Sequence, residues 1–448
     1  MNSFYIQRLG CPKNDVDADY IAGFLRLHQL VQVDRPEDAD LLIVNSCGFI
    51  QAAKEESIDA VLALAKLKEN QNRKKLVITG CLSQRYADEL RRDIPELDGI
   101  FGINDFAGLK EVIEGTAGQV VIRNANPMVF QGCDFPRAIN PAESYGYIKI
   151  ADGCDNRCSY CAIPNIRGRY RSSPIDDICR EARWLLDNGK RELILVSQES
   201  SAFGRDLYGK PRLIELLERL IRLDGDFWIR VMYLHPARID AELVDYMIDN
   251  PKICNYFDVP VQHIDDALLR AMGRKVTSDQ IERVIDLIRA RQERAAIRTT
   301  VMVGFPGETE AQFEDLCRFI EKRRFDRLGA FTYSAEDETP AAALPGRIDD
   351  ETKEWRQHRL MEIQQEIAFE NNRAEKGRQL EVIVDGADGN GRTAVGRTRF
   401  DAPEIDQTVR FDSADVNPGD LITVTITGCD GYDLLGERGT HEPHRQPR

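Results

Sequence analysis

Three short apolar runs near the start of the chain each lead into a glycine or serine and then a cysteine. The runs are residues 4–9, 41–44 and 76–79, and the cysteines are Cys11, Cys47 and Cys81. Helical patterns follow over residues 17–29, 52–68 and 83–92. The cysteines are 36 and 34 residues apart, close to the roughly 30-residue length of a strand–helix–strand unit. This spacing predicts a Rossmann-like parallel α/β domain over residues 1–122, with its thiols at the sheet edge where such domains bind ligands.

The common position of these thiols favours a shared metal site over three separate structural roles. A single free cysteine is most often a buried small residue. Three cysteines at the same topological position, each beside glycine or serine, are better explained by one ligand that they all bind. We therefore expect Cys11, Cys47 and Cys81 to hold a metal centre together.

A second group of cysteines lies in the segment GCDNRCSYCAIPNIRG, residues 153–168. Cys154, Cys158 and Cys161 have the spacing C-x3-C-x2-C. Three thiolates can hold three corners of a cubane 4Fe–4S cluster and leave one iron open for a substrate or cofactor. The alternative is a zinc site completed by a distant ligand, although no histidine pair accompanies the loop. Tyr160 is expected to shield the site from water.

A longer β/α series begins at Tyr145, just before the cysteine loop. Its predicted strands are residues 147–151, 193–196, 229–233, 256–259, 298–303 and 328–332. Six strand–helix units predict a partial or complete parallel β/α barrel over residues 145–374, with its chemistry on the loops after the strands. A cap followed by proline at the first helical position marks one helix start, and capping-box spacing marks two others. These starts are Ser173-Pro174, Thr277 with Gln280, and Thr309 with Gln312.

The remaining segments differ in composition from these two series. Residues 123–144 carry proline, asparagine and glycine without periodicity, and they are predicted to be a linker. A long helix is predicted over 349–376, and β-type runs follow at 380–384, 408–411 and 421–427. These runs predict a small antiparallel β-barrel over residues 375–438. Residues 439–448 are expected to be a disordered tail, and the fold class is α/β multidomain.

Charge and cysteine content exclude several classes of protein. A net charge of −15 and a pI near 5.1 argue against nucleic acid as the direct substrate and suit a basic partner. No apolar run is long enough for a signal peptide or a membrane span, which predicts a cytoplasmic protein without a membrane partner. The cysteines are therefore expected to be reduced. Those without companion spacing are predicted to be structural: Cys133, Cys179, Cys254, Cys317 and Cys429.

The C-x3-C-x2-C loop after the first strand of a β/α series resembles that of the radical S-adenosylmethionine (SAM) superfamily. With a three-cysteine α/β domain before it and a TRAM-like barrel after it, nearly the whole chain resembles the methylthiotransferase family. The resemblance implies a partial β/α barrel whose cysteines bind a 4Fe–4S cluster, with SAM on its open iron. It also implies that Cys11, Cys47 and Cys81 bind a second 4Fe–4S cluster, which carries the sulfur to be inserted into the substrate.

Four segments resemble the branch of this family that modifies a ribosomal protein. They are LGCPKND at 9–15, VPVQHIDDALLRAMGRK at 259–275, VGFPGET at 303–309 and FTYSAEDETPAAALP at 331–345. QESSAFGRDL at 198–207 is a looser match. The resemblance implies methylthiolation of the β-carbon of an aspartate in the small-subunit ribosomal protein S-twelve. One SAM molecule would donate the methyl group and a second would be the radical source.

Two other functions are compatible with the sequence. The tRNA branch of the family methylthiolates an adenosine, and it typically has a Gly-Cys-Gln-Met-Asn run where this chain has Gly-Cys-Pro-Lys-Asn. The other alternative is a non-catalytic iron–sulfur or zinc scaffold that binds a ribosomal protein. Between residues 378 and 433, five arginines stand against eleven acids, which suits a basic protein substrate better than RNA. The sequence identifies neither the electron donor nor the sulfur donor.

The SAM pocket is expected at the carboxyl ends of the central strands. The residues at these ends are Ser197, Gln198, Gln262, His263 and Gly304. Their polar groups are suited to the ribose and methionine ends of SAM. The alternatives are a structural role for His263 and an ordinary strand-to-helix turn at Gly304–Gly307.

Overall fold

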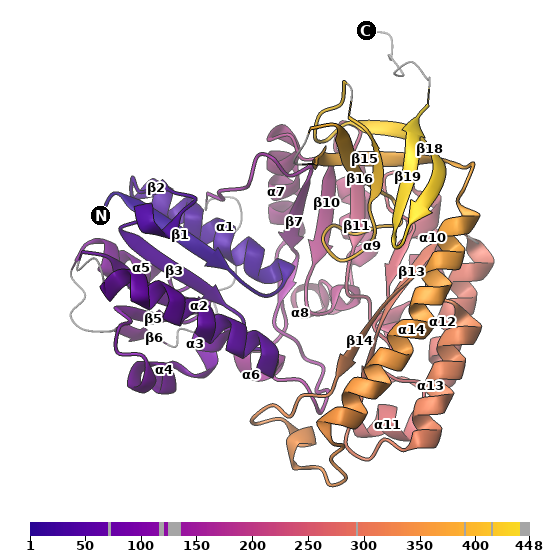
Figure 1. Ribbon diagram of the computed structural model, residues 1–448, viewed down its shortest axis with the longest axis horizontal. Coiled ribbons are helices and arrows are strands. Elements are labelled where there is room, and N and C mark those ends of the chain that lie inside the picture. Colours follow the sequence, from indigo (N-terminus) through magenta and orange to yellow (C-terminus); the bar gives the residue numbers. More distant parts are fainter. Residues whose placement is uncertain are drawn as a thin grey trace.

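The computed structural model describes residues 1–69, 73–115, 121–123, 136–292, 294–388, 391–413 and 415–439. Most of the predicted linker, Cys133 and the predicted tail from residue 440 onward lie outside the described residues. Figure 1 shows an N-terminal α/β unit, a curved central β/α unit and a small C-terminal barrel. In the part of the chain that is described, no helix is long and apolar enough to cross a membrane.

The N-terminal unit is a parallel sheet with strand order β2-β1-β3-β4-β5-β6. Its strands are β1 Ser3–Arg8, β2 Val31–Gln32, β3 Leu41–Ser46, β4 Lys75–Gly80, β5 Gly99–Phe101 and β6 Val121–Arg123. Its helices are α1 Pro12–Leu27, α2 Gln51–Glu69, α3 Cys81–Arg85, α4 Ala87–Asp93 and α5 Phe106–Ile113. The predicted Rossmann-like parallel domain is confirmed, with the flavodoxin-type strand order among doubly wound folds.

That strand order determines where this unit can bind a ligand. The chain leaves β1 for β2 on one side and later returns to β3 on the other side. The crevice beyond the carboxyl ends of β1 and β3 is therefore the topological switch point, where open parallel sheets bind ligands. Every residue of β3 is buried, as expected for a parallel strand covered on both faces.

The central unit has six parallel strands in two hydrogen-bonded groups, β11-β10-β7 and β12-β13-β14. The strands are β7 Tyr145–Lys149, β10 Glu192–Val196, β11 Trp228–Val231, β12 Tyr256–Asp258, β13 Ala296–Val303 and β14 Arg327–Thr332. A bridge between Ile229 and Ile253 and the hydrogen bond from Leu234 N to Asp258 O connect the groups. The predicted partial barrel of six strand–helix units is confirmed.

Helices cover the convex face of the central strands (Figure 1). They are α7 Ile175–Asp187, α9 Leu213–Ile221, α10 Ala241–Asp249, α12 Ser278–Arg291, α13 Glu310–Arg323 and α14 Asp350–Ala374. Shorter elements lie on the connecting loops: β8 Ala151–Asp152, β9 Arg171–Ser172, α6 Ile163–Arg167, α8 Arg205–Tyr208 and α11 Asp266–Ala271. On β13, Ile297 and Val301 pack into the outer core, while Arg298 and Thr300 are only half-buried. The alternation leaves polar groups on the concave face.

The predicted helix starts are mostly confirmed. Thr277 with Gln280 and Thr309 with Gln312 form capping boxes at α12 and α13. At α7 the prediction was wrong by one residue, because Pro174 is itself the N-cap and the helix begins at Ile175. Since the Ser173 side chain makes no cap there, the proline alone sets the chain direction into the helix.

The C-terminal unit is a closed barrel with strand order β15-β16-β17-β19-β18. The strands are β15 Gln379–Ala387, β16 Thr393–Thr398, β17 Val409–Asp412, β18 Leu421–Asp430 and β19 Asp433–Arg438. The predicted barrel is confirmed, but β17 and β19 pair in parallel, so it is not entirely antiparallel. The short polar strands β16 and β19 lack the apolar run that marked the other three.

The small barrel packs against the amino ends of the central strands, as Figure 1 shows. Glu192, the first residue of β10, is fully buried and accepts hydrogen bonds from Arg230 and from Arg397 of the barrel, each at 2.6 Å. Tyr256 at the start of β12 donates to Asp406, and Arg327 at the start of β14 binds Asp401. The barrel is therefore held at the end of the core opposite the loops that follow the strands.

Replacing Glu192 with glutamine is expected to lower the free energy of unfolding by about 3–5 kcal/mol, because two buried guanidinium groups lose their shared carboxylate. Burial raises the pKa of Glu192, but Arg230 and Arg397 lower it more, so the net shift is downward. The stabilisation is therefore present above the ordinary glutamate pKa and is lost as pH falls through the lower folded-state value. Chemical denaturation followed by the fluorescence of Trp228, at the same interface, measures the change.

The half-exposed Glu381 of the same barrel pairs with Arg399 and provides the matched control. Its replacement by glutamine is expected to cost less than about 1 kcal/mol, because exposed ion pairs contribute little. Equal losses in the two variants would contradict a special role for the buried carboxylate.

Candidate active site

The structure places the three N-terminal thiols at the ends of adjacent strands. Cys11 precedes helix α1, Cys47 follows β3, and Cys81 is the first residue of α3 after β4. Gly10 has φ +97°, and a Cβ atom there would lie 2.9 Å from Cys47 Cβ and 3.1 Å from Cys47 Sγ. The missing side chain at Gly10 therefore lets the first two cysteine segments meet at the switch point.

The electrostatics of this triad favour a bound cation. Burial raises the pKa of Cys47 to about 12, and Cys81 and Cys11 contribute further upward shifts. Burial also raises the pKa of Cys81. Without a metal, these thiols therefore stay protonated at neutral pH, whereas iron would stabilise all three as thiolates. The donor set fits an iron–sulfur cluster.

The second triad lies on the loop between β8 and α6, at the opposite end of the core from the small barrel. Ser159 holds this loop: its N donates to Met272 O at 2.8 Å, and its Oγ donates to Ala271 O at 2.7 Å. Burial raises the pKa of Cys154 to about 11 and of Cys161 to about 12, and Cys158 adds to both shifts. This triad therefore has the same preference for a cationic centre.

Two side chains enclose this second triad. Tyr160 packs against the cluster of Met272, Phe305 and Tyr333; its role in shielding the site from water stays a prediction. Arg274 lies beside Cys158: burial lowers the pKa of its guanidinium, but interactions with Tyr160 and Cys158 raise it more, so the net shift is upward. Within the described ranges, no three His, Cys, Asp or Glu side chains converge on a single ion. Each cysteine of a cubane cluster binds a different iron, so such convergence is not required.

A buried ion-pair network joins the two cysteine loops. Arg167, the last residue of α6, donates to Asn14 Oδ1 at 2.6 Å and to Asp17 at 3.0 Å, and it also binds Asp152 at 3.1 Å. Lys149 binds the same two carboxylates. Each of the four charged side chains is no more than 10% exposed. We call Lys149, Asp17, Asp152 and Arg167 the junction quartet.

Asn14 connects the quartet to the N-terminal triad. Its amide donates to Leu9 O and Ser46 O, each at 3.0 Å, next to two of the cysteines. Cys81 Sγ is 3.7 Å from Asn14 Oδ1. The motif segment 331–345 makes a second junction, where buried Glu336 binds Lys54 and Arg85 of the N-terminal unit. Polar contacts between the two domains thus fix the positions of the two cysteine loops relative to each other.

The predicted SAM residues differ in whether their polar atoms already have hydrogen-bond partners. Gln198 extends from the end of β10, and its amide oxygen and nitrogen are buried without a partner among the described residues. Ser197 is fully buried, and its Oγ is used by Ser200 Oγ and Glu199 N. Glu199 accepts from Asn156 of the cysteine loop and from Arg238. Gln198 is therefore the free polar group, while its neighbours shape the turn.

Gln262 has φ +71°, in the left-handed region. Its N donates to Thr300 O and its O accepts from Met302 N, each at 2.8 Å. Tyr233, near the end of β11, has φ +62°. Strained backbone of this kind is concentrated at functional sites. Both residues lie at the carboxyl edge where the pocket was predicted.

His263 and Gly304 both contact the buried carboxylate of Glu308. His263 Nε2 is 3.2 Å from Glu308 Oε1, and His263 Nδ1 accepts from Asp265 N. Gly304 N donates to Glu308 at 2.5 Å, and Arg356 binds the same carboxylate. A Cβ atom at Gly304 would lie 2.1 Å from Lys353 Cγ, so the close packing of α14 requires glycine. Both ring nitrogens of His263 are already partnered, which supports its structural alternative; SAM contact by either residue stays a prediction.

Sequence reasoning missed Lys13, Asn14 and the junction quartet. Lys149 offered one signal, because it is a charged residue at the end of an otherwise apolar strand. The other described unpaired cysteines, Cys179, Cys254, Cys317 and Cys429, are free thiols. Their structural role stays a prediction.

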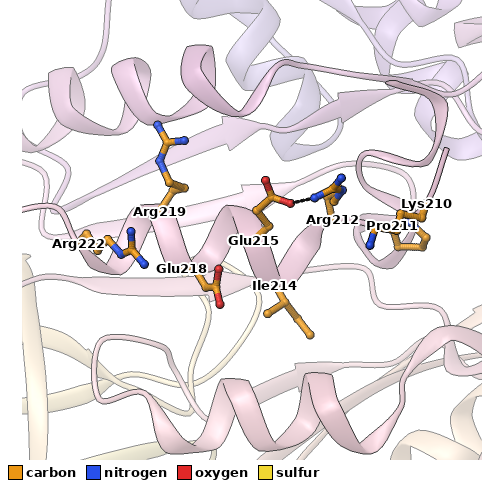
Figure 2. A pocket seen from close by; sticks show the side chains of 8 residues that line it. All are labelled: Lys210, Pro211, Arg212, Ile214, Glu215, Glu218, Arg219 and Arg222. Atoms are coloured by element: carbon orange, nitrogen blue, oxygen red, sulfur yellow. Dashed lines mark hydrogen bonds and ion pairs between the residues drawn. The ribbon is translucent and has the colours of Figure 1, made fainter. Parts of the chain in front are cut away.

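A surface hollow of about 440 Å³ lies over helix α9 and the residues that precede it. Figure 2 shows its lining, in which Arg212 is bonded to Glu215 and the basic side chains of Arg219 and Arg222 project nearby. None of the predicted site residues lines this hollow. It is therefore separate from the cysteine triads.

Family models match three separate parts of the chain. Residues 3–102 match the family described as "Uncharacterized protein family UPF0004", residues 148–320 match the radical SAM superfamily, and residues 377–438 match the TRAM domain. These ranges correspond to the N-terminal sheet, the central strands and the small barrel.

Solved structures of radical SAM enzymes share the fold. TsrM of Kitasatospora setae, with cobalamin and a 4Fe–4S cluster bound, has a TM-score of 0.55 and 15% identity, covering 76% of this chain and 77% of its own. The cobalamin-dependent enzyme OxsB has a TM-score of 0.52 and 12% identity, covering 81% of this chain and 56% of its own. At these identities the likeness establishes the fold alone.

Curated relatives match almost the full length. The protein of Clostridioides difficile strain 630 is 43% identical over 96% of this chain and 98% of its own. That of Desulforamulus reducens is 43% identical over 98% and 99%, and that of Carboxydothermus hydrogenoformans is 44% identical over 97% and 99%. Each is named ribosomal protein uS12 methylthiotransferase RimO. Identity at this level over the whole length, with all three domains matched, means that the chain belongs to the RimO family of methylthiotransferases in the radical SAM superfamily.

Proposed function

We propose that this enzyme methylthiolates the β-carbon of an aspartate in ribosomal protein uS12. The observation that carries the proposal is the pair of cysteine triads at one domain junction, joined through Asn14 and the junction quartet. Sulfur insertion at an unactivated carbon needs a radical source and a sulfur carrier near the same carbon. Two triads held at one domain junction support such an arrangement.

Each triad is proposed to hold one 4Fe–4S cluster, with Cys11, Cys47 and Cys81 at the first and Cys154, Cys158 and Cys161 at the second. When bound, the clusters supply the electron that cleaves SAM to a 5′-deoxyadenosyl radical and the sulfur that is transferred. The raised pKa values of two thiols in each triad, Cys47 with Cys81 and Cys154 with Cys161, support this assignment, because such thiols ionise more readily beside a cationic centre. The protein contributes position and the exclusion of water.

Among the predicted SAM contacts, Gln198 has the strongest support. Its buried amide has no partner among the described residues and would gain hydrogen bonds from a bound ligand. Gln262 lies at the neighbouring strand ends in a strained conformation. Ser197, His263 and Gly304 would act through the shape of the turns, because their polar groups are already bonded.

The acidic barrel is proposed to engage the basic ribosomal protein. Part of its negative charge is used internally, because Asp401 and Asp406 are buried against Arg327 and Arg298 of the core. The exposed acids, such as Asp430 at 74%, still outnumber the exposed arginines. This surplus supports attraction of a lysine- and arginine-rich surface. No observation favours the tRNA alternative over uS12.

Mass analysis after reaction tests the proposed function. Iron-reconstituted enzyme, SAM and a reductant are incubated anaerobically with small ribosomal subunits or with purified tRNA. We expect uS12 to gain the mass of a methylthio group in place of one hydrogen, and tRNA to stay unchanged. A modified adenosine with unmodified uS12 would support the tRNA alternative and overturn the proposal.

A further inference from the structure

Lys13 differs from the other buried lysines of the described chain. Lys74 and Lys190 donate to backbone carbonyl groups, and Lys149 binds two carboxylates. Lys13 is only 8% exposed, yet no carbonyl or carboxylate oxygen among the described residues accepts from its ammonium group. Its Nζ instead stands 3.8 Å from the centroid of the Tyr233 ring. Its polar partners are the Tyr233 side chain and the Cys11 thiol, and no carboxylate of the described residues forms an ion pair with it.

This arrangement leaves the cation incompletely compensated. A buried ammonium group that lacks a hydrogen-bonded counter-ion loses several kcal/mol of hydration. Contact with an aromatic ring returns only about 0.5–2 kcal/mol. An anionic group of a bound ligand would therefore stabilise the Lys13 ammonium group.

The position of Lys13 indicates where such an anion would lie. Lys13 is two residues from Cys11, in the first turn of α1. The Tyr233 backbone is held by neighbouring segments on both sides: its N donates to Asp258 Oδ2 and its O accepts from Ser200 N, each at 2.9 Å. Lys13 thus extends from the N-terminal triad to the carboxyl edge of the central strands.

The protein's own carboxylate on this face does not fill the role. Asp258 already accepts from Tyr233 N, and its other oxygen is 3.5 Å from Arg298 Nη1. It makes no ion pair with Lys13 in the described structure. Among the described residues, an incoming carboxylate therefore has no competing carboxylate within ion-pair distance of the ammonium group.

We infer that Lys13 binds the side-chain carboxylate of the substrate aspartate and thereby positions the adjacent β-carbon beside the N-terminal triad. The inference rests on the proposed function, because it requires an aspartate as the substrate. The carboxylate carbon is bonded directly to the β-carbon, so a contact at the carboxylate fixes the atom that is to be modified. Lys13 would then distinguish aspartate from its neutral isostere asparagine.

Equilibrium binding to the reconstituted holoenzyme tests Lys13 without requiring turnover. Two peptides carry the uS12 sequence around the modified aspartate, one with aspartate and one with asparagine at that position. We expect the wild-type enzyme to bind the aspartate peptide about 10- to 100-fold more tightly, as for a charge-assisted hydrogen bond in a buried site. Lys13→Met should bind the two peptides equally, whereas Lys13→Arg should keep most of the preference.

Lys75 provides the matched control. It is exposed at the amino end of β4, and the cysteines lie at the carboxyl ends of the strands of the same sheet. Lys75→Met should retain the wild-type preference. An unchanged aspartate preference in Lys13→Met, or no preference in the wild type, would overturn the inference. Altered iron content or cluster spectra in Lys13→Met with the preference intact would instead make Lys13 a counter-ion of the cluster, which also overturns it.

The same experiment separates this inference from the proposed function. Preferential binding of the aspartate peptide by the wild type, abolished in Lys13→Met, supports the role of Lys13 even if no methylthiolated product forms. Absence of product from both the peptide and the ribosomal subunit would reject the proposed reaction alone.

Discussion

Replacing Cys158 with alanine is expected to reduce the formation of 5′-deoxyadenosine from SAM to the level of a protein-free control. Cys158 is the central thiol of the second triad, between Cys154 and Cys161, and Arg274 lies against it. Two thiolates cannot hold the three corners that leave a single iron open. Chromatography of the products after anaerobic reduction measures the loss.

Two variants show whether the loss is specific. Cys179→Ala on helix α7 changes a half-buried cysteine of the outer layer and should retain SAM cleavage. Cys47→Ala should also cleave SAM, but it should insert no sulfur, because Cys47 belongs to the first triad. Wild-type yields of 5′-deoxyadenosine from Cys158→Ala would contradict the assignment of the radical-generating site.

Replacing Arg167 with methionine is expected to lower the free energy of unfolding by about 3–5 kcal/mol, because a buried ion network loses one partner. Lys149 alone would then face Asp17 and Asp152, and Asn14 Oδ1 would lose its guanidinium donor. The destabilisation should be concentrated at the domain junction. Chemical denaturation gives its size, and hydrogen exchange in α1 and α6 gives its location.

Arg169 is two residues farther along the same loop, and its 85% exposed side chain pairs with Asp155. Arg169→Met should change stability by less than about 1 kcal/mol, since an exposed ion pair contributes little. If Arg167→Met were as stable as Arg169→Met, the quartet would not be what fixes the two cysteine loops relative to each other.

Much of the fold followed from local patterns in the sequence. Apolar runs ending in small residues predicted β1, β3 and β4, and the capping boxes at Thr277 and Thr309 predicted the starts of α12 and α13. The errors arose where local signals are weak. Strand β19 is short and polar, and its parallel pairing with β17 depends on contacts within the closed barrel.

The site was predictable where chemistry and spacing coincide, and less so where distant residues meet. The six cysteines stood out because thiols recur after strands or at close intervals. Arg167 and Asp17 are 150 residues apart, and nothing local indicates that they form an ion pair. The role inferred for Lys13 likewise depends on its contact with Tyr233, which lies on another domain. Such residues become visible only when burial and partners are known.

The small barrel is attached to the amino ends of the central strands, and the cysteine loops lie at the other end. A partner that contacts both ends of the core must therefore have a segment long enough to span it. Strands of about six residues rise roughly 20 Å along the core. A compact protein lying on the barrel therefore delivers its reactive residue only if that residue sits at the tip of a protruding segment at least about six extended residues long. Enzyme and partner would thus be matched by reach as well as by charge.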